Sequence, residues 1–330
     1  MARHALVPIP PRGAIQARMA ARRTPALFAE TAAGQERFWE FFGGSIRNPN
    51  TRLAYVTAAY RFADWCAGRG LTLSTVRPLH VAGYIEQLTQ TYAAATVKQH
   101  LAGLRQLFDW LVVGQVMPSN PAAAVRGPKH VVKMGKTPVL TAAETRALLT
   151  SIDTTSLIGL RDRALIGVMV YGFARVSAAL AMRVADYYTQ GPRSYFRLHE
   201  KGGKYLVVPA HHTAQRYTDE YVALAGLAAD PKGPLFRSAG ARRGRDQLVP
   251  RPLAREDAAA MIKRRARAAG LPAEVCAHSF RGTGITEYLR AGGTLETAAR
   301  IAGHESTRTT QLYNRLPDEV SLDEIERIHI

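Results

Sequence analysis

A stretch of prolines and basic residues at 117–137 constrains the fold more than any other feature of the sequence. It contains Pro118, Pro121 and Pro128, and none of its residues is acidic. Proline lacks the N–H that a helix needs and disfavours helical backbone in the residue before it, so no regular helix can run through this stretch. The segment therefore divides the 330-residue chain into two domains joined by an extended basic linker.

The part of the chain before this linker is helical in pattern. Apolar residues recur at spacings of three and four in three successive segments between 53 and 113, and an aromatic cluster at 38–42 indicates a further helix. Glycines follow two of these segments and mark helix ends. We expect a small helical bundle. The residues before the bundle, 1–34, contain five arginines and a single acid and are predicted to form a flexible basic arm.

The part after the linker combines helix and strand signals. Thr141 and Glu144 have the spacing of a capping box, which opens a helix. Two alternating segments, 195–198 and 205–208, flank a Gly-Gly turn and predict an antiparallel hairpin. The expected fold class is mainly α with a small antiparallel β-sheet, a helical domain followed by a mixed α+β domain. The predicted segments are the arm 1–34, the helical domain 35–116, the linker 117–137 and the α+β domain 138–330.

The charge balance points to a polyanionic partner. The chain has 44 Lys and Arg against 26 Asp and Glu, a formal net charge of +18. Nucleic acid is the usual partner of so basic a chain, and a basic soluble enzyme without one remains the alternative. Phosphate contacts are expected from the linker, the hairpin turn and the basic segment 235–268. The predicted DNA-binding residues are Arg126, Lys129, Lys133, Lys136, Lys204, Arg242, Arg243, Arg245, Lys263 and Arg264.

Several other classes are disfavoured. The longest apolar run, 164–174, is too short to cross a bilayer. Cys66 and Cys276 are too few for a disulfide scaffold and suit a reducing, cytoplasmic compartment. The acids are scattered among arginines, and H-E-x-x-H, C-x-x-C and Walker A patterns are absent from the sequence. We therefore expect no membrane association, no metal and no other cofactor; phosphoryl charge would be stabilised by Arg, Lys and His.

Five short motifs follow one another in the second domain. They are Arg161-Asp162-Arg163 leading to Arg175-Val176-Ser177, then Lys201-Gly202-Gly203-Lys204, His278-Ser279-Phe280-Arg281, Gly303-His304 and Tyr313. In this order and spacing they resemble the motifs of the tyrosine recombinase (phage integrase) family, over roughly residues 36–330. The resemblance implies a SAM-like core-binding domain and a catalytic domain that together clamp double-stranded DNA.

The resemblance also implies the chemistry. The implied catalytic residues are Arg175, Lys201, His278, Arg281, His304 and the nucleophile Tyr313. The phenol attacks the scissile phosphate and forms a 3′-phosphotyrosyl link, while the two arginines and His304 hold the phosphate. His278 assists proton transfer, and Lys201 protonates the leaving 5′ oxygen. The implied activity is site-specific recombination without metal or ATP; a non-catalytic DNA-binding protein of the same fold and a monomeric type IB-like topoisomerase are the alternatives.

The residue types support part of this assignment by themselves. His278 and Arg281 are three apart, so they share one face of a helix. Two arginines brought together can bind both non-bridging oxygens of one phosphodiester. Each residue taken alone also allows an ordinary structural role: a salt bridge for Arg175, a solvated turn for Lys201 and the core for Tyr313.

The C-terminal residues carry a second capping-box pattern, Ser321 to Glu324. It opens a predicted helix at 321–330 with an apolar stripe of Leu322, Ile325 and Ile328. The resemblance implies that this stripe docks on a neighbouring protomer and links a homo-tetramer on DNA. Packing within its own chain is the alternative.

Four positions depart from the family's usual pattern, and one of them, Ala174, adds a residue between Gly172 and Arg175. Ala178 stands where a Glu usually follows the first arginine, Gly282 replaces a common His, and Leu206 replaces a common Arg. None of these changes removes an implied catalytic group. The change at Ala178 leaves open how Arg175 is braced.

Overall fold

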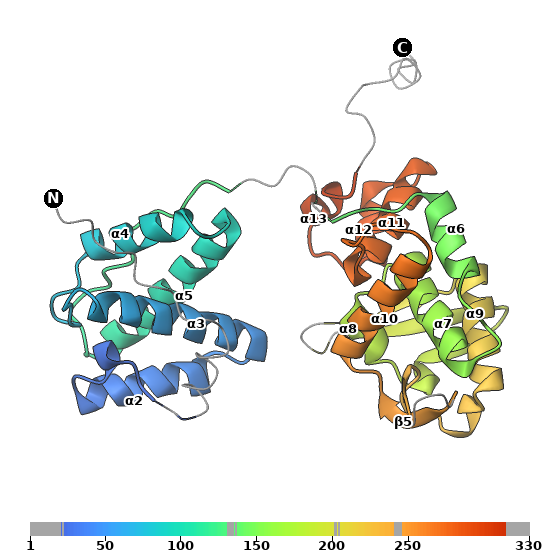
Figure 1. The fold of residues 1–330 in the computed structure, drawn as a ribbon, viewed down its shortest axis with the longest axis horizontal. Coiled ribbons are helices and arrows are strands. Elements are labelled where there is room, and N and C mark those ends of the chain that lie inside the picture. Colours follow the sequence, from blue (N-terminus) through green and yellow to red (C-terminus); the bar gives the residue numbers. More distant parts are fainter. Residues whose placement is uncertain are drawn as a thin grey trace, which may run out of the picture. The chain divides into compact units, whose positions relative to one another are not determined.

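The computed structural model describes residues 21, 23–130, 135, 137–200, 203, 205–240 and 246–314. The chain divides into two compact units between residues 131 and 132, and helices dominate both of them (Figure 1). Within the described ranges, no helix combines the length and the hydropathy that a membrane span requires.

The first unit is helical, and its core is rich in aromatic rings. Phe38 is fully buried and its ring contacts those of Phe28, Phe42 and Tyr60. The helices predicted from periodicity are present. The elements are η1 (Ala26–Phe28), α2 (Ala32–Glu40), the π-helix η2 (Phe41–Ser45), α3 (Pro49–Ala67), α4 (Pro78–Thr89) and α5 (Ala94–Val113).

The structure extends this unit beyond both predicted ends. Phe28, placed in the predicted arm, is fully buried, and Met117, Ala122 and Val125, placed in the predicted linker, belong to the same core. The Arg105 guanidinium donates to the carbonyls of Ala122 and Val125. The expectation of an extended linker from residue 117 is therefore wrong for 117–125. Helix α5 ends before Gly114 as expected, but the apolar residues of 117–125 pack back onto the core of this unit.

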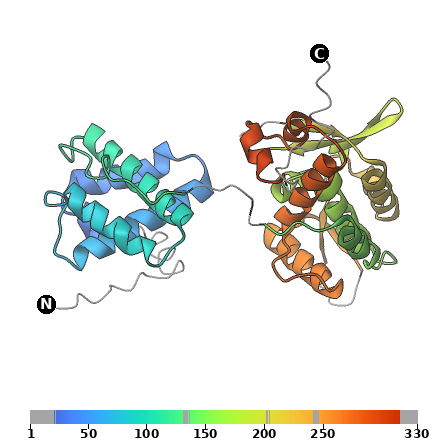
Figure 2. The same cartoon turned by 90° about the horizontal axis from the view of Figure 1, so that it is seen from above.

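The second unit is a helical layer with two small antiparallel sheets. The larger sheet has the order β1-β2-β3 and lies at one edge of the unit (Figure 2). The predicted hairpin is β2–β3, and the fold class is as predicted. The elements are α6 (Ala142–Thr150), α7 (Leu157–Tyr171), α8 (Val176–Leu180), η3 (Val184–Asp186), β1 (Tyr187–Gln190), β2 (Arg193–His199), β3 (Tyr205–Pro209), α9 (His212–Leu224), η4 (Leu227–Ala229), β4 (Arg237–Ala239), β5 (Leu248–Pro252), α10 (Arg255–Ala268), α11 (Ala277–Arg290), α12 (Leu295–Ile301) and α13 (Thr307–Gln311).

Helix α7 is the centre of this unit, because it is buried on most of its surface and packs against both α9 and α11. The approach of α11 is especially close at Gly284. A Cβ added there would lie 1.9 Å from the Val170 carbonyl oxygen and 2.8 Å from the Phe173 ring. Glycine at this position therefore sets the spacing between the helix that precedes Arg175 and the helix that carries Arg281.

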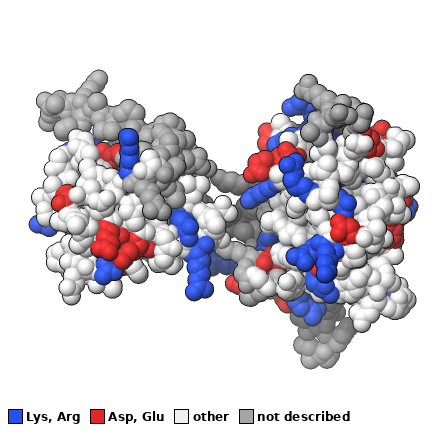
Figure 3. All heavy atoms as spheres, turned by 90° about the horizontal axis from the view of Figure 1, so that it is seen from below, with Lys and Arg blue, Asp and Glu red and all other residues white. Residues whose placement is uncertain are grey.

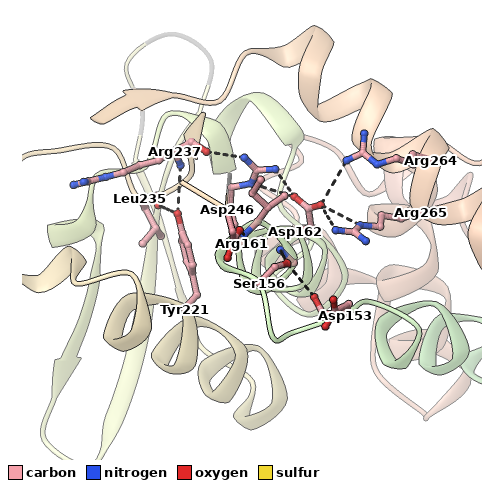
Figure 4. A network of polar contacts seen from close by, with 12 residues as sticks. Asp153, Ser156, Arg161, Asp162, Tyr221, Leu235, Arg237, Asp246, Arg264 and Arg265 are labelled. Carbon is pink, nitrogen blue, oxygen red and sulfur yellow. Dashed lines mark hydrogen bonds and ion pairs between the residues drawn. The ribbon is translucent and has the colours of Figure 1, made fainter. Parts of the chain in front are cut away.

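A buried acid ties α7 to α10 (Figure 4). Asp162 is fully buried and accepts hydrogen bonds from Arg161 at 2.6 Å and from Arg265 at 2.8 Å. Arg264 approaches the same carboxylate at 3.9 Å. A buried carboxylate with several guanidinium partners is stable only as a complete set, because each charge needs its partners in the low-dielectric interior.

Candidate active site

Arg281 joins three segments at the centre of the site. It lies on α11, one turn after His278, and is 1% exposed. Its guanidinium donates to the carbonyls of Phe173 and Ala302 and, through Nη2, to His304 Nε2 at 2.7 Å. Among the described residues its Nε is buried and has no hydrogen-bond partner. An unpaired donor in the interior is costly, so this N–H is suited to an incoming anion.

The backbone on either side of Arg281 is shaped for these contacts. Phe173 has a φ of 49°, a left-handed conformation that is uncommon outside glycine. Its carbonyl is the one that accepts from Arg281. Gly303, with a φ of 58°, ends the turn after α12 and places His304 next to the arginine.

His304 is neutral and has a defined tautomer. Arginine can only donate, so His304 Nε2 accepts from Arg281 and Nδ1 carries the hydrogen that reaches Thr310 Oγ1 at 2.8 Å. Burial and the nearby cations Arg281 and Arg175 lower the pKa of His304 to about 4. The contact seen for His304 is thus with Arg281. Its implied contact with the phosphate itself stays a prediction.

Tyr313 lies beside His278 and His304. Ser306 caps α13, which ends at Gln311, so Tyr313 follows the helix instead of lying in it. The phenol hydroxyl lies 2.5 Å from His278 Nε2, and the tyrosine is 6% exposed. A Cβ at Gly282 would lie 3.2 Å from the tyrosine ring. The departure at Gly282 therefore gives the ring a flat surface to pack on.

The chain that enters the second unit passes beside this tyrosine. The N–H of Gly135 donates to the carbonyl of Leu312 at 2.9 Å. A few residues later the N–H of Leu140 donates to Thr283 Oγ1, also at 2.9 Å. The backbone at Gly135 and Leu140 thus contacts both Leu312, the neighbour of Tyr313, and α11.

The electrostatics keep the proton on the phenol of Tyr313 and leave His278 neutral before DNA binds. Burial and then Arg281 and Arg175 lower the pKa of His278, so its imidazole is neutral at pH 7 and Nε2 can accept a proton. Burial raises the pKa of Tyr313, an effect that Arg281 and Arg175 oppose. Burial and the repulsion of Arg175 lower the pKa of Arg281 to about 10. Two cations held this close create a site for an anion.

Arg175 stands at the start of α8 with its side chain 38% exposed and forms an ion pair with Glu200. It also lines a cavity of about 420 Å³ together with His278 and Arg281. The salt bridge considered for Arg175 is therefore present, alongside a place in the pocket. Sequence reasoning missed Glu200, whose signal was its place directly before the lysine motif. It also missed Arg255, another basic residue on the cavity wall.

Comparison with known proteins agrees with this geometry. Residues 138–319 match the model of the phage integrase family, and residues 37–114 match that of the phage integrase N-terminal SAM-like domain. The tyrosine recombinase XerC of Rhizobium meliloti (strain 1021) is 32% identical over 314 residues, 93% of this chain and 92% of that protein. The chain belongs to the phage integrase family.

Other members of the family are similar over most of their length. The tyrosine recombinase XerC of Myxococcus xanthus is 28% identical, covering 86% of this chain and 91% of the relative. The crystal structure of XerH bound to difH substrate in a post-cleavage complex has a TM-score of 0.64 at 17% identity, covering 92% and 90% of the two chains. A lambda integrase dimer on a COC′ core site also has a TM-score of 0.64, at 18% identity, covering 94% and 84%. These structures share the fold.

The structure brings together five of the six residues implied by the family resemblance. Arg175, His278 and Arg281 line one cavity, His304 contacts Arg281, and Tyr313 contacts His278. Lys201 lies outside the described residues. In the parts of the chain that are described, no group of three or more His, Cys, Asp or Glu side chains is placed to hold a metal ion.

The predicted DNA contacts are only partly described. Arg126 and Lys129 are exposed at the end of the first unit, and Lys263 and Arg264 are exposed on α10. Figure 3 shows basic side chains spread over the drawn face of each unit. The predicted residues that lie outside the described ranges are Lys133, Lys136, Lys204, Arg242, Arg243 and Arg245, as do Leu322, Ile325 and Ile328 of the predicted C-terminal helix.

Proposed function

We propose that this phage integrase family member breaks and rejoins double-stranded DNA at a specific site through a 3′-phosphotyrosyl link to Tyr313. The contact of the phenol with His278 Nε2, 2.5 Å away and beside Arg281, carries the proposal. It puts a nucleophile, a base and a cation in one pocket of one subunit.

The steps follow from the groups in this pocket. The Tyr313 hydroxyl gives its proton to His278 as its oxygen attacks phosphorus, and the bond from phosphorus to the 5′ oxygen breaks. Arg175 and Arg281 stabilise the charge of the five-coordinate transition state. Lys201 supplies the proton to the departing 5′ oxygen. The phosphotyrosyl ester keeps the energy of the broken bond, so a 5′-hydroxyl from a partner strand can reverse the reaction without metal or ATP.

Strand exchange between two duplexes requires several copies of the enzyme, and a homo-tetramer is part of the proposal. A lambda integrase tetramer bound to a Holliday junction shares the fold, with a TM-score of 0.62 at 18% identity. The apolar stripe predicted at 321–330 would link neighbouring copies. A largely apolar cavity of about 350 Å³, lined among others by Val170, Phe173, Tyr288 and Ile301, offers a surface that could receive it.

The test is covalent capture. Purified enzyme is incubated with a fragmented genomic library, denatured, and recovered with any DNA still attached; sequencing the fragments maps the site. Wild type and Tyr217→Phe, which removes a hydroxyl on α9 of the same unit, should both form the adduct. Tyr313→Phe should form none. An adduct in Tyr313→Phe would assign the nucleophile to another residue, and specific binding without any wild-type adduct would favour the non-catalytic alternative.

The mapped duplex then separates recombinase from topoisomerase. A recombinase forms a complex of four protomers with two duplexes and exchanges strands between differently labelled copies. A monomeric topoisomerase relaxes supercoiled DNA as a single protomer and makes no exchanged product. The mass of the complex by light scattering and the size of the labelled products decide between them.

A further inference from the structure

The usual bracing acid is missing from this chain, and another acid contacts the arginine. Ala178 carries only a methyl group and is 1% exposed within the core of the second unit. It has no polar atom to offer to a guanidinium. Instead, the Glu200 carboxylate contacts Nη1 of Arg175. Glu200 comes from a different part of the fold, at the end of β2 and one residue before Lys201.

The position of Glu200 is fixed by its surroundings. The preceding residue, His199, pairs with Tyr205 of β3 and contacts Asp186 Oδ2 through Nε2 at 2.7 Å. On the other side, a Cβ at Gly303 would lie 3.9 Å from Arg175 Nη1 and 4.0 Å from the Glu200 carboxyl carbon. The ion pair is therefore packed against the turn that carries His304.

The exposed fractions of the two side chains show which member of the ion pair faces the solvent. The Glu200 side chain is 10% exposed, whereas that of Arg175 is 38% exposed. The acid is covered and the cation is open, so Glu200 supports the guanidinium from behind and does not cover the entrance to the site. Guanidinium has five N–H donors, and one contact to Glu200 leaves donors for a phosphate.

Glu200 also reduces the repulsion inside the site. Arg175 lowers the pKa of Arg281, and Glu200 opposes that effect. Both arginines must point at one phosphate, and before DNA arrives the Glu200 carboxylate is a countercharge that offsets their repulsion.

We propose that Glu200 is a positioning residue that holds Arg175 for the scissile phosphate, in place of the acid absent at Ala178. The proposal rests on the proposed function for its catalytic consequence. Since Glu200 directly precedes Lys201, the same residue links the phosphate-binding arginine to the hairpin that carries the general acid. Loss of its charge should slow the chemical step and leave DNA binding nearly unchanged.

The first test uses Glu200→Gln, which keeps the size of the side chain and removes its charge. Single-turnover cleavage of the mapped duplex, nicked to trap the adduct and at saturating enzyme, should slow by about 30-fold, since misplacing a catalytic group by about 1 Å costs up to about 100-fold. The dissociation constant, measured in a Tyr313→Phe background, should change by less than about threefold. Glu200→Asp should recover part of the rate. The control is Glu220→Gln, which breaks the Arg163–Glu220 pair of the same unit and should cleave as wild type does.

The second test does not depend on DNA chemistry. Phenylglyoxal reacts with unpaired arginines, and peptide mass spectrometry gives its rate at Arg175. We expect a rise of about tenfold in Glu200→Gln and none in Glu220→Gln. If wild type forms no adduct, the proposed function fails, but the phenylglyoxal rate still shows whether Glu200 holds Arg175.

Three results would overturn the proposal. An unchanged phenylglyoxal rate at Arg175 would show that Glu200 does not hold the arginine. Faster cleavage or much tighter DNA binding by Glu200→Gln would show that the carboxylate competes with the phosphate. Equal loss of rate in Glu200→Gln and Glu200→Asp, together with a lowered unfolding midpoint, would reduce Glu200 to a structural role.

Discussion

The contact between α7 and α11 predicts a large effect from a single methyl group at Gly284. In Gly284→Ala the new Cβ would lie 1.9 Å from the Val170 carbonyl oxygen, where real contacts are no shorter than 3.0 Å. The helices must therefore separate by about 1.1 Å. Overpacking of this kind costs about 3 kcal/mol, and the better helix propensity of alanine returns about 1 kcal/mol. We expect a net loss of about 2 kcal/mol.

The same displacement should weaken catalysis more than its stability cost suggests. Gly284 lies three residues after Arg281, and Phe173, which the new methyl group would contact, accepts a hydrogen bond from that arginine. A shift of about 1 Å at a catalytic group costs up to about 100-fold in rate. Folded Gly284→Ala should therefore form the phosphotyrosyl adduct tens of times more slowly at a temperature well below its midpoint.

Urea unfolding followed by circular dichroism measures the loss of stability, and the rate of adduct formation on the mapped duplex measures the loss of catalysis. Gly83→Ala is the matched control, because Gly83 is an exposed glycine of α4 with no atom within 4 Å of an added Cβ. It should be as stable as wild type or gain up to about 1 kcal/mol. Equal stability and equal activity of the two variants would refute the argument from helix spacing.

Two further predictions concern charge. Because the pKa of His278 is lowered, its imidazole stays neutral at and above pH 7. The rate of cleavage should therefore be constant from pH 7 to 9 and fall only below the usual imidazole range, near 6.5. A rate that rises as the pH falls would contradict the role of His278 as a base. Asp162→Asn should lower the free energy of unfolding by about 3–5 kcal/mol, because it leaves buried arginines without their countercharge. Its control, Glu40→Gln, breaks an exposed i,i+3 pair and should lower the free energy of unfolding by at most about 1 kcal/mol. Similar urea midpoints for the two variants would contradict the value for Asp162→Asn.

Local patterns predicted much of the candidate site. The spacing of His278 and Arg281 was decisive because one helix carries both and its period fixes their common face. The capping box of Thr141 and Glu144 was also local and was predicted correctly. Periodicity could not show that α13 stops before Tyr313, because helix ends depend on tertiary packing.

Long-range pairing accounts for what sequence reasoning missed. The contact of Glu200 with Arg175 depends on how β2 packs beside α8, which no spacing of 25 residues reveals. The burial of Met117 and Val125 has a similar origin. Gly114 correctly predicts where α5 ends, yet the carbonyls that Arg105 binds hold the following chain against the first unit.

The hydrogen bond from Gly135 to Leu312 has a mechanical consequence. Gly135 and Leu312 both belong to the second unit, and their hydrogen bond fixes the backbone one residue before Tyr313. A substitution that displaces Gly135 therefore acts on the backbone that positions the Tyr313 phenol.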